Sequence, residues 1–157
     1  MAKKKAPDRQ FAAQNRKARH DYFIDENIEA GIVLEGAEVK SLRSGQGSLV
    51  DAWAGERDGE LWMFSAYIPQ YVSSHEPNYV SRRPRKLLVH KRELNRLLAA
   101  IQREGVTLVP LSIYFNDRGI AKVDLGIARG KRKYDKRETA KKRDWDRQKA
   151  RLLRENR

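Results

Sequence analysis

The chain of 157 residues contains no cysteine. This absence excludes a disulfide scaffold, a cysteine-ligated zinc site and thiol catalysis. No apolar run approaches the roughly 18 residues that a membrane-spanning helix needs. The first residues are not followed by the apolar stretch of a secretory signal. We therefore expect a small, soluble, cytoplasmic protein.

The sequence also lacks the residue patterns of common catalytic and metal-binding sites. None of its histidines, His20, His75 and His90, has a second histidine at metal-ligand spacing. The glycine-rich residues 44–48 are not followed by the Lys-Ser/Thr pair of a phosphate-binding loop, and no serine lies in a nucleophile-elbow pattern. We therefore expect a binding protein with no catalytic residue, no metal site and no cofactor.

Positive charge is in excess, and it gathers at the two ends of the chain. Lys and Arg number 34 against 21 Asp and Glu, which gives a net charge of +13. Residues 1–20 carry a net +6 and residues 128–157 a net +9, whereas the body between them carries −2. Fourteen cations among the last thirty residues exceed what solubility requires. The predicted partner is a nucleic acid, with a membrane surface or an acidic protein as the alternatives.

The near-neutral body has the pattern of a mainly β protein. Strand signals lie at residues 22–24, 30–34, 49–53, 61–68, 85–90, 107–115 and 120–127. An Asp-Gly pair at 58–59 indicates a hairpin turn, and residues 69–84 indicate a long loop. One helix is predicted over residues 91–104, where leucines and an isoleucine recur at helical spacing. This order predicts a small closed antiparallel barrel of the oligonucleotide-binding (OB) type with an inserted helix; a β-sandwich would leave the helix unexplained.

Beyond residue 130 the composition changes. Helix-forming charged residues dominate, and the large apolar side chains are too few for a core. We expect a basic tail that is disordered in the free protein and helical against a polyanion. The predicted organisation is a flexible basic N-terminus at 1–14, the barrel at 15–130 and the tail at 131–157.

Two segments are rich in cations, and the first of them, residues 15–22, also contains a histidine and an aromatic residue. Residues 15–22 would neutralise phosphates and stack on a base, or form a solvated arm. Residues 82–86 have the same two interpretations. Glu29, at a strand entry, is either solvated or an acceptor for an exocyclic amino group or a ribose 2′-hydroxyl.

Four segments resemble, in order, the motifs of the bacterial SsrA-binding (small protein B) family. Residues 29–43 are similar to its signature stretch, 15–23 to the motif before it, 85–90 to its central strand and 130–138 to the opening of its tail. The resemblance extends over about residues 12–157.

This resemblance implies an OB-type barrel that binds transfer-messenger RNA and delivers it to ribosomes stalled on messages without a stop codon, for rescue and peptide tagging. It implies no enzyme activity. The implied RNA-binding residues are Arg16, Lys17, Arg19, His20, Glu29, Leu88 and His90. Leu88 has a second interpretation, because an apolar strand residue is more often part of the core.

The resemblance further implies that the tail works inside the ribosome. The implied tail positions are Gly130, Tyr134, Asp135, Lys136, Arg137, Leu152 and Leu153. Asp135, Lys136 and Arg137 would lie near the 16S rRNA decoding centre, with the following helix in the empty message channel; some members have His where this chain has Tyr134.

The implied partners are transfer-messenger RNA, the stalled 70S ribosome and, through the charged RNA, elongation factor Tu and alanyl-tRNA synthetase. The protein is expected to be a monomer with no membrane partner. A stable ribosomal protein and an RNA-processing nuclease are the alternative functions.

Overall fold

Seven strands and four helices make up the part of the chain that the computed structural model describes, residues 10–130 and 133–155. The strands are β1 (Gln10–Gln14), β2 (Tyr22–Ile32), β3 (Trp53–Arg57), β4 (Glu60–Phe64), β5 (Arg85–Leu88), β6 (Thr107–Phe115) and β7 (Ala121–Gly130). The helices are α1 (Ala18–Asp21), α2 (Gly36–Arg43), α3 (Lys91–Glu104) and α4 (Lys133–Glu155).

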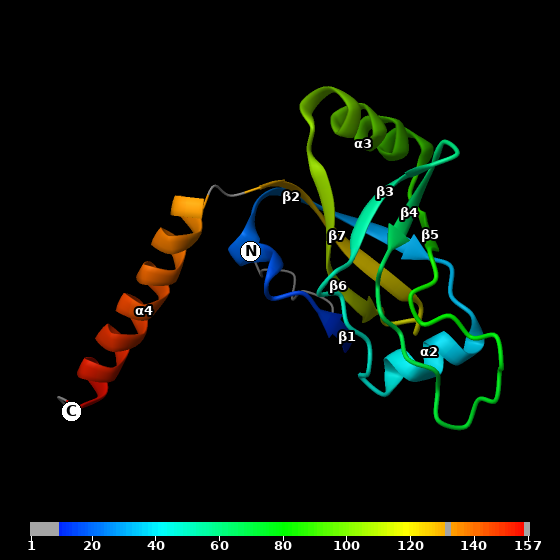
Figure 1. Ribbon diagram of the computed structural model, residues 1–157, viewed down its shortest axis with the longest axis horizontal. Helices are drawn as coiled ribbons and strands as arrows, with labels where there is room; N and C mark the ends of the chain where they lie inside the picture. Colours follow the sequence, from blue (N-terminus) through cyan, green and yellow to red (C-terminus); the bar gives the residue numbers. More distant parts are fainter. Residues whose placement is uncertain (1–9, 131–132, 156–157) are drawn as a thin grey trace, which may run out of the picture.

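The strands form one antiparallel sheet that closes into a barrel. Their order is β1-β6-β3-β4-β5-β2-β7, and β6 and β7 pair as well, which joins the two sides of the sheet. The start of β6 pairs with β3 and its end with β1. Helices α2 and α3 lie at opposite ends of the barrel (Figure 1). The predicted mainly β, OB-type barrel with an inserted helix is thereby confirmed.

The barrel interior is filled by alternate residues of the strands. Fully buried side chains include Leu61, Met63, Leu108, Ile113, Val123 and Leu125. Helix α3 adds Leu97, which is 1% exposed, and ends at Gly105, whose φ of 62° suits glycine. A second, smaller apolar cluster lies around Ala18 of α1 and Val109 of β6.

The clearest periodicities gave the most accurate predictions. Helix α3 and strand β6 have the predicted bounds. The predicted hairpin is present, with φ values of 53° and 76° at Asp58 and Gly59. These left-handed values match the two-residue turn that Asp-Gly favours.

Other boundaries differ for identifiable reasons. The predicted strands at 22–24 and 30–34 are one strand, β2, because the polar residues between them lie on a strand whose other face is buried. Strand β3 begins at Trp53, since residues 49–52 form a turn. Strand β4 ends at Phe64, and Ser65 after it has a φ of 61°. Helix α2 was not predicted.

The N-terminal boundary of the barrel also needs correction. The sequence placed residues 10–14 in a flexible N-terminus, but they form β1 and pair with β6. Ala12 and Ala13 are small enough to be buried there against the barrel. Residues 1–9 lie outside the described residues.

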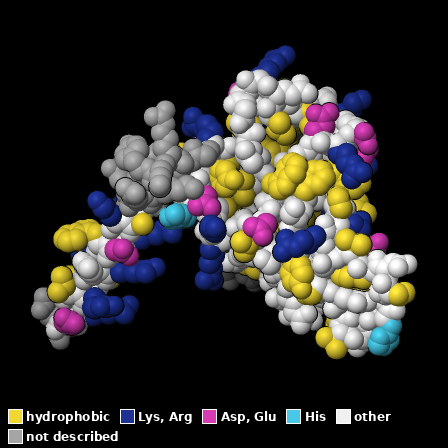
Figure 2. All heavy atoms as spheres, in the orientation of Figure 1, with side chains coloured by type: hydrophobic (Ala, Val, Ile, Leu, Met, Phe, Trp, Pro, Cys, Tyr) yellow, Lys and Arg dark blue, Asp and Glu magenta, His cyan; other side chains and the backbone are white. Residues whose placement is uncertain are grey.

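The basic tail contains a helix of 23 residues, α4. The predicted helix is therefore present, and disorder of the free tail stays a prediction. High helix propensity of Lys, Arg, Glu, Gln and Ala is the physical reason for the helix. Helix α4 extends away from the barrel (Figure 1), and Lys and Arg side chains line it (Figure 2). Within the described segments, none of the helices is long and apolar enough to cross a membrane.

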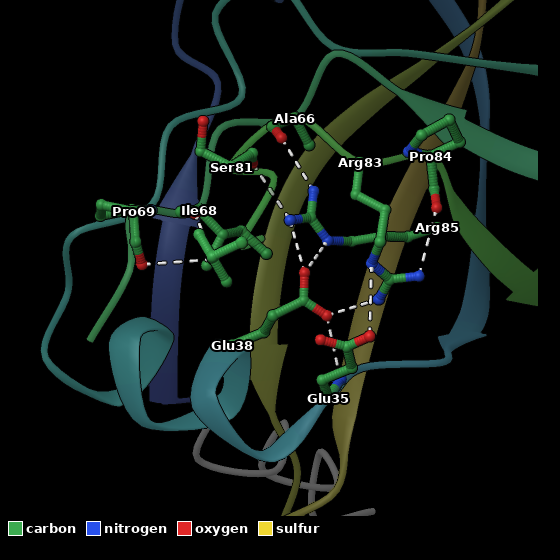
Figure 3. Close-up of polar contacts among 10 residues, drawn as sticks. Glu35, Glu38, Ala66, Ile68, Pro69, Ser81, Arg83, Pro84 and Arg85 are labelled. Carbon is green, nitrogen blue, oxygen red and sulfur yellow. Dashed lines mark hydrogen bonds and ion pairs between the residues drawn. The ribbon is translucent and has the colours of Figure 1, made fainter. Parts of the chain in front are cut away.

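A buried ion cluster joins α2 to the strand that follows the long loop. Arg85 and Glu38 are both fully buried, with Arg85 Nε 2.5 Å from Glu38 Oε2 (Figure 3). Arg83 Nη2 donates to Glu38 Oε1 at 2.6 Å. Arg85 also donates to the carbonyl oxygens of Ala66 and Ser81, at 2.9 and 3.1 Å. One guanidinium thus connects a helix, the residues after β4 and the end of the loop.

The protonation of Glu38 follows from these contacts. Burial alone would raise the pKa of its carboxyl. The hydrogen bonds from the Glu35 backbone, Arg83 and Arg85 outweigh burial, so the pKa lies below its ordinary value of 4.5. The carboxylate is therefore charged in the folded protein at neutral pH.

Replacing Glu38 with Ala should destabilise the fold by about 3–5 kcal/mol, because it leaves the Arg85 guanidinium buried without its counter-ion. Urea unfolding measures this loss. The matched control is Glu60→Ala, which removes a partly exposed pair with Lys86 at 2.9 Å and should cost about 0–1 kcal/mol. Equal losses in the two variants would contradict a structural role for the cluster.

Stability should also fall with acid in a way that depends on Glu38. Because the folded pKa lies below the ordinary 4.5, the stabilisation is present above that pH and is lost as the pH falls through the folded pKa. Below pH 4.5 the unfolding free energy of the natural protein should drop more steeply than that of Glu38→Gln, by up to about 1.4 kcal/mol per pH unit. Parallel pH profiles would count against this explanation.

Candidate nucleic-acid interface

Residues 15–21, which we call the basic arm, precede β2 and are held in place by one buried side-chain amide. Asn15 is 8% exposed, and its Nδ2 donates to the carbonyl oxygens of Leu49 and Pro110 at 3.1 and 3.2 Å. Its Oδ1 accepts the backbone N–H of Ala18 at 3.2 Å. These bonds fix the short turn of α1 to the barrel. Asn15 therefore has a structural role that the sequence did not reveal.

The cations of the arm lie outward from this anchor. Arg16, Lys17 and Arg19 are exposed, whereas His20 is partly buried. The His20 Nδ1 lies 3.0 Å from Asp21 Oδ1, which orients the ring. The arm thus presents positive charge from a fixed backbone rather than from a loose tail.

Two predicted RNA-binding residues, Glu29 and Leu88, lie where β2 meets β5, and a third, His90, follows β5 in the chain. Gly31 of β2 pairs with Leu88 of β5, and Glu29 lies two residues earlier on the same face of β2. Leu88 is 51% exposed, so the interpretation as a core residue is wrong. His90 is exposed and is the residue before α3, with no side-chain capping bond.

A glycine shapes this surface. A Cβ on Gly31 would lie 3.3 Å from the Leu88 Cβ, tighter than ordinary contact. Glycine therefore allows Leu88 to lie close against β2. The result is an exposed apolar side chain beside the carboxylate of Glu29.

The arm and the barrel face adjoin each other. Glu29 is directly opposite Asp124 in the β2–β7 pairing. Asp124 also lines a pocket of about 310 Å³ together with Arg16 and Arg19 of the arm. The same pocket is lined by Phe11, whose side chain is 51% exposed. The structure therefore brings together two groups of residues that the sequence singled out separately.

Sequence reasoning missed two polar residues of this face, Lys122 and Asp124. Lys122 is opposite Gly31 on one side and Tyr114 on the other. Apolar and polar residues alternate over residues 120–127, and this pattern indicated that the Lys122 and Asp124 side chains point outward. Only the pairing of β7 with β2 brings them next to Glu29.

The second basic segment, residues 82–86, is not a free cationic surface. Arg83 and Arg85 bind Glu38, as described above. Lys86 Nζ lies 2.9 Å from Glu60 Oε1, and Arg82 lies 3.8 Å from Asp51. The interpretation as a solvated cluster is wrong for the buried Arg85, which pairs with Glu38. Arg82 is 53% exposed, so an RNA contact from this end of the segment stays a prediction.

The tail residues lie on α4 and at the end of β7. Gly130 is the last residue of β7, paired with Tyr22. Tyr134, Asp135, Lys136 and Arg137 lie in the first turns of α4. Further along, Leu152 and Leu153 are 59% and 64% exposed. Helix α4 contacts the region of α1, and its Arg143 lines the pocket beside the arm.

The face carries groups that can bind a nucleic acid. Among the side chains that the structure describes, those of residues 10–129 and 140–155, no three His, Asp or Glu are grouped to hold a metal ion. The face instead combines guanidinium and ammonium groups with an exposed aromatic ring, an exposed leucine and carboxylate acceptors. This combination is typical of RNA recognition, where phosphates are neutralised and unpaired bases are stacked and hydrogen-bonded.

Comparisons with known proteins agree with this geometry. Residues 12–155 match the family described as SmpB protein. An SsrA-binding protein of Paramagnetospirillum magneticum is 58% identical over 144 residues, which cover 92% of this chain and 94% of that protein. One from Bradyrhizobium sp. strain BTAi1 is 53% identical over 154 residues, 98% of each chain.

A solved structure extends the likeness to three dimensions. It was described as "tmRNA-SmpB: a journey to the center of the bacterial ribosome". The match has a TM-score of 0.65 and 52% identity, and covers 81% of this chain and 92% of that one. With the barrel, the arm and the tail helix all accounted for by one group of relatives, this chain belongs to the SmpB, or SsrA-binding protein, family.

Proposed function

We propose that the protein binds transfer-messenger RNA through the barrel face and the basic arm, and acts as an adaptor in trans-translation. The observation that carries the proposal is the continuous surface from the arm to Leu88, through Asp124 and Glu29. The names of its relatives, and of the similar structure on the ribosome, support the same RNA partner.

Each part of this surface has a distinct task in the proposal. Arg16, Lys17 and Arg19 neutralise phosphates, and His20 adds a ring beside them. Glu29 accepts a hydrogen bond from a base or a ribose hydroxyl, while Leu88 packs on the exposed sugar or base. The exposed imidazole of His90, two residues after Leu88 in the chain, supplies a further donor or acceptor.

The tail is proposed to act on the ribosome. Helix α4 is exposed along its described side chains and strongly basic, which suits a passage lined by RNA phosphates. In the proposal Tyr134, Asp135, Lys136 and Arg137 lie near the 16S rRNA decoding centre. Leu152 and Leu153 then lie deeper in the empty message channel, and Gly130 is where the tail leaves the barrel.

The remaining partners follow from the RNA. Elongation factor Tu and alanyl-tRNA synthetase meet the protein through the charged transfer-messenger RNA. The protein works as a cytoplasmic monomer that rescues the stalled 70S ribosome and allows tagging of the nascent peptide. A stable ribosomal protein would instead be found at one copy per ribosome in growing cells, and a nuclease would degrade the purified RNA in the presence of Mg²⁺.

Glu29→Ala and His90→Ala should each weaken transfer-messenger RNA binding by about 1–3 kcal/mol, the range for a good side-chain contact to a base edge. Filter binding at one fixed salt concentration measures the effect, with circular dichroism to verify the fold. The matched control is Glu56→Ala, an exposed carboxylate on β3 across the barrel. If Glu29→Ala bound transfer-messenger RNA with the affinity of the natural protein, Glu29 would not belong to the interface.

Truncation after Gly130 should separate the two tasks. The apolar core is formed by the barrel, so the shortened protein should fold and retain transfer-messenger RNA binding. Some loss of affinity is expected because long-range attraction and Arg143 disappear. Peptide tagging on stalled ribosomes, measured in a reconstituted translation system, should fail. Loss of RNA binding with intact tagging would reverse the proposed roles.

A triple substitution locates the ribosomal task within the tail. Asp135, Lys136 and Arg137 changed together to Ala should abolish most tagging while RNA affinity stays nearly natural. The matched control changes Asp146, Arg147 and Lys149, which removes the same net charge from the same helix. Equal tagging defects in the two triple variants would point to charge alone rather than to the first turns of α4.

A further inference from the structure

A buried tyrosine lies on the outer side of the barrel, next to the proposed RNA-binding face. Tyr114 of β6 is 2% exposed, although its strand neighbours Ile113 and Phe115 are the ones that belong to the barrel core. Its cross-strand partners are Lys122 and Phe11. The Phe11 ring packs edge-on against the Tyr114 ring, with centroids 6.3 Å apart. A phenol buried in this way needs a hydrogen-bond acceptor for its hydroxyl.

The acceptor is Glu29. The Tyr114 hydroxyl donates to Glu29 Oε2. Glu29 is on β2 and Tyr114 on β6, with β7 between them. Neighbouring strands lie about 4.8 Å apart, so the two side chains reach toward each other over roughly 10 Å of sheet. Among the residues whose side chains the structure describes, 10–129 and 140–155, none forms a hydrogen bond with the other carboxylate oxygen, Oε1.

The bond also opposes a repulsion. Asp124 is directly opposite Glu29, and like charges at such a position repel each other. The amide of Asn27 on β2 donates to Asp124 Oδ2 at 3.3 Å, so each carboxylate of the pair accepts a hydrogen bond from another strand. Without the tyrosine hydroxyl, the exposed Glu29 side chain would be free to turn away from Asp124 and to exchange among rotamers.

We propose that Tyr114 is a positioning residue for RNA recognition: its hydroxyl fixes Glu29 so that Oε1 is presented to the RNA. This inference rests on the proposed role of Glu29. A side chain ordered before binding does not lose rotamer freedom when the complex forms, and affinity rises accordingly. Tyr114 itself contributes no exposed surface to the RNA.

The test begins with Tyr114→Phe, which removes only the hydroxyl. Transfer-messenger RNA affinity should fall about three- to tenfold, the range for leaving one flexible side chain to be ordered on binding. The matched control is Tyr79→Phe, which removes a hydroxyl that donates to the Ile68 carbonyl in the long loop, at 2.5 Å. The control should lose little RNA affinity, even if both variants melt at a lower temperature.

A double-mutant cycle separates positioning from general stability. In a Glu29→Ala background, Tyr114→Phe should cause no further loss of affinity, because the hydroxyl acts only through that carboxylate. An equal loss in both backgrounds would overturn the proposal. The proposal would also be overturned if Tyr114→Phe bound the RNA with natural affinity while Glu29→Ala bound it weakly. In that case the proposed function would still stand. Natural affinity of Glu29→Ala would overturn this proposal and would also remove Glu29 from the proposed interface.

A measurement on the natural chain applies even if Tyr114→Phe does not fold. Three-bond NMR couplings report whether the Glu29 side chain holds one rotamer before RNA is added. A single rotamer, unchanged on RNA binding, is the expected result. Rotamer averaging in the free protein would overturn the positioning role of Tyr114.

Discussion

The pairing of β7 with both β2 and β6 is the constraint on which the rest of the structure depends. It closes the sheet into a barrel, with β7 paired to a strand on each side. The same hydrogen bonds set Asp124 opposite Glu29 and Lys122 opposite Gly31. A slip of one residue would turn every one of these side chains to the other face. The fold and the recognition surface are therefore specified by one set of backbone contacts.

Charge is divided according to what each segment must contact. Arg16, Lys17 and Arg19 of the arm are exposed, and so are the cations of α4 from Lys141 to Arg154. The cations of residues 82–86 are instead matched with Glu38, Glu60 and Asp51. A local cluster of Arg and Lys is thus either exposed for binding or paired within the fold. The position of nearby carboxylates decides which of the two occurs.

Hydrophobic periodicity correctly predicted the elements whose formation depends on residues close together in the sequence. Helix α3 and strand β6 have strong patterns over many residues, and their bounds were predicted correctly. Helix α2 has eight residues and begins with a capping box built from Glu35 and Glu38, with few apolar residues to reveal it. Strand β1 is short, and it is recognisable only through its pairing with β6. Long-range pairing is the information that local pattern does not contain.

The candidate site was predictable to the same degree. Arg16, Lys17 and Arg19 are exposed cations, as their composition suggested. The burial of Arg85 could not be foreseen, because its partner Glu38 lies 47 residues away in the sequence. The resemblance to a known family identified Glu29, Leu88 and His90 as a group. The structure adds the reason why Glu29 and Leu88 lie on one face, which is the pairing of β2 with β5.

The length of α4 makes it a rigid spacer as well as a carrier of charge. A helix of 23 residues measures about 35 Å at 1.5 Å per residue. A flexible chain of the same length would have its far end spread over a wide range of distances. The helix instead fixes both the reach and the rotation of Leu152 and Leu153 relative to its own first turn. Removing one residue from its middle would turn the far end by about 100°, whereas removing seven would shorten the spacer by about 10 Å and nearly preserve its facing.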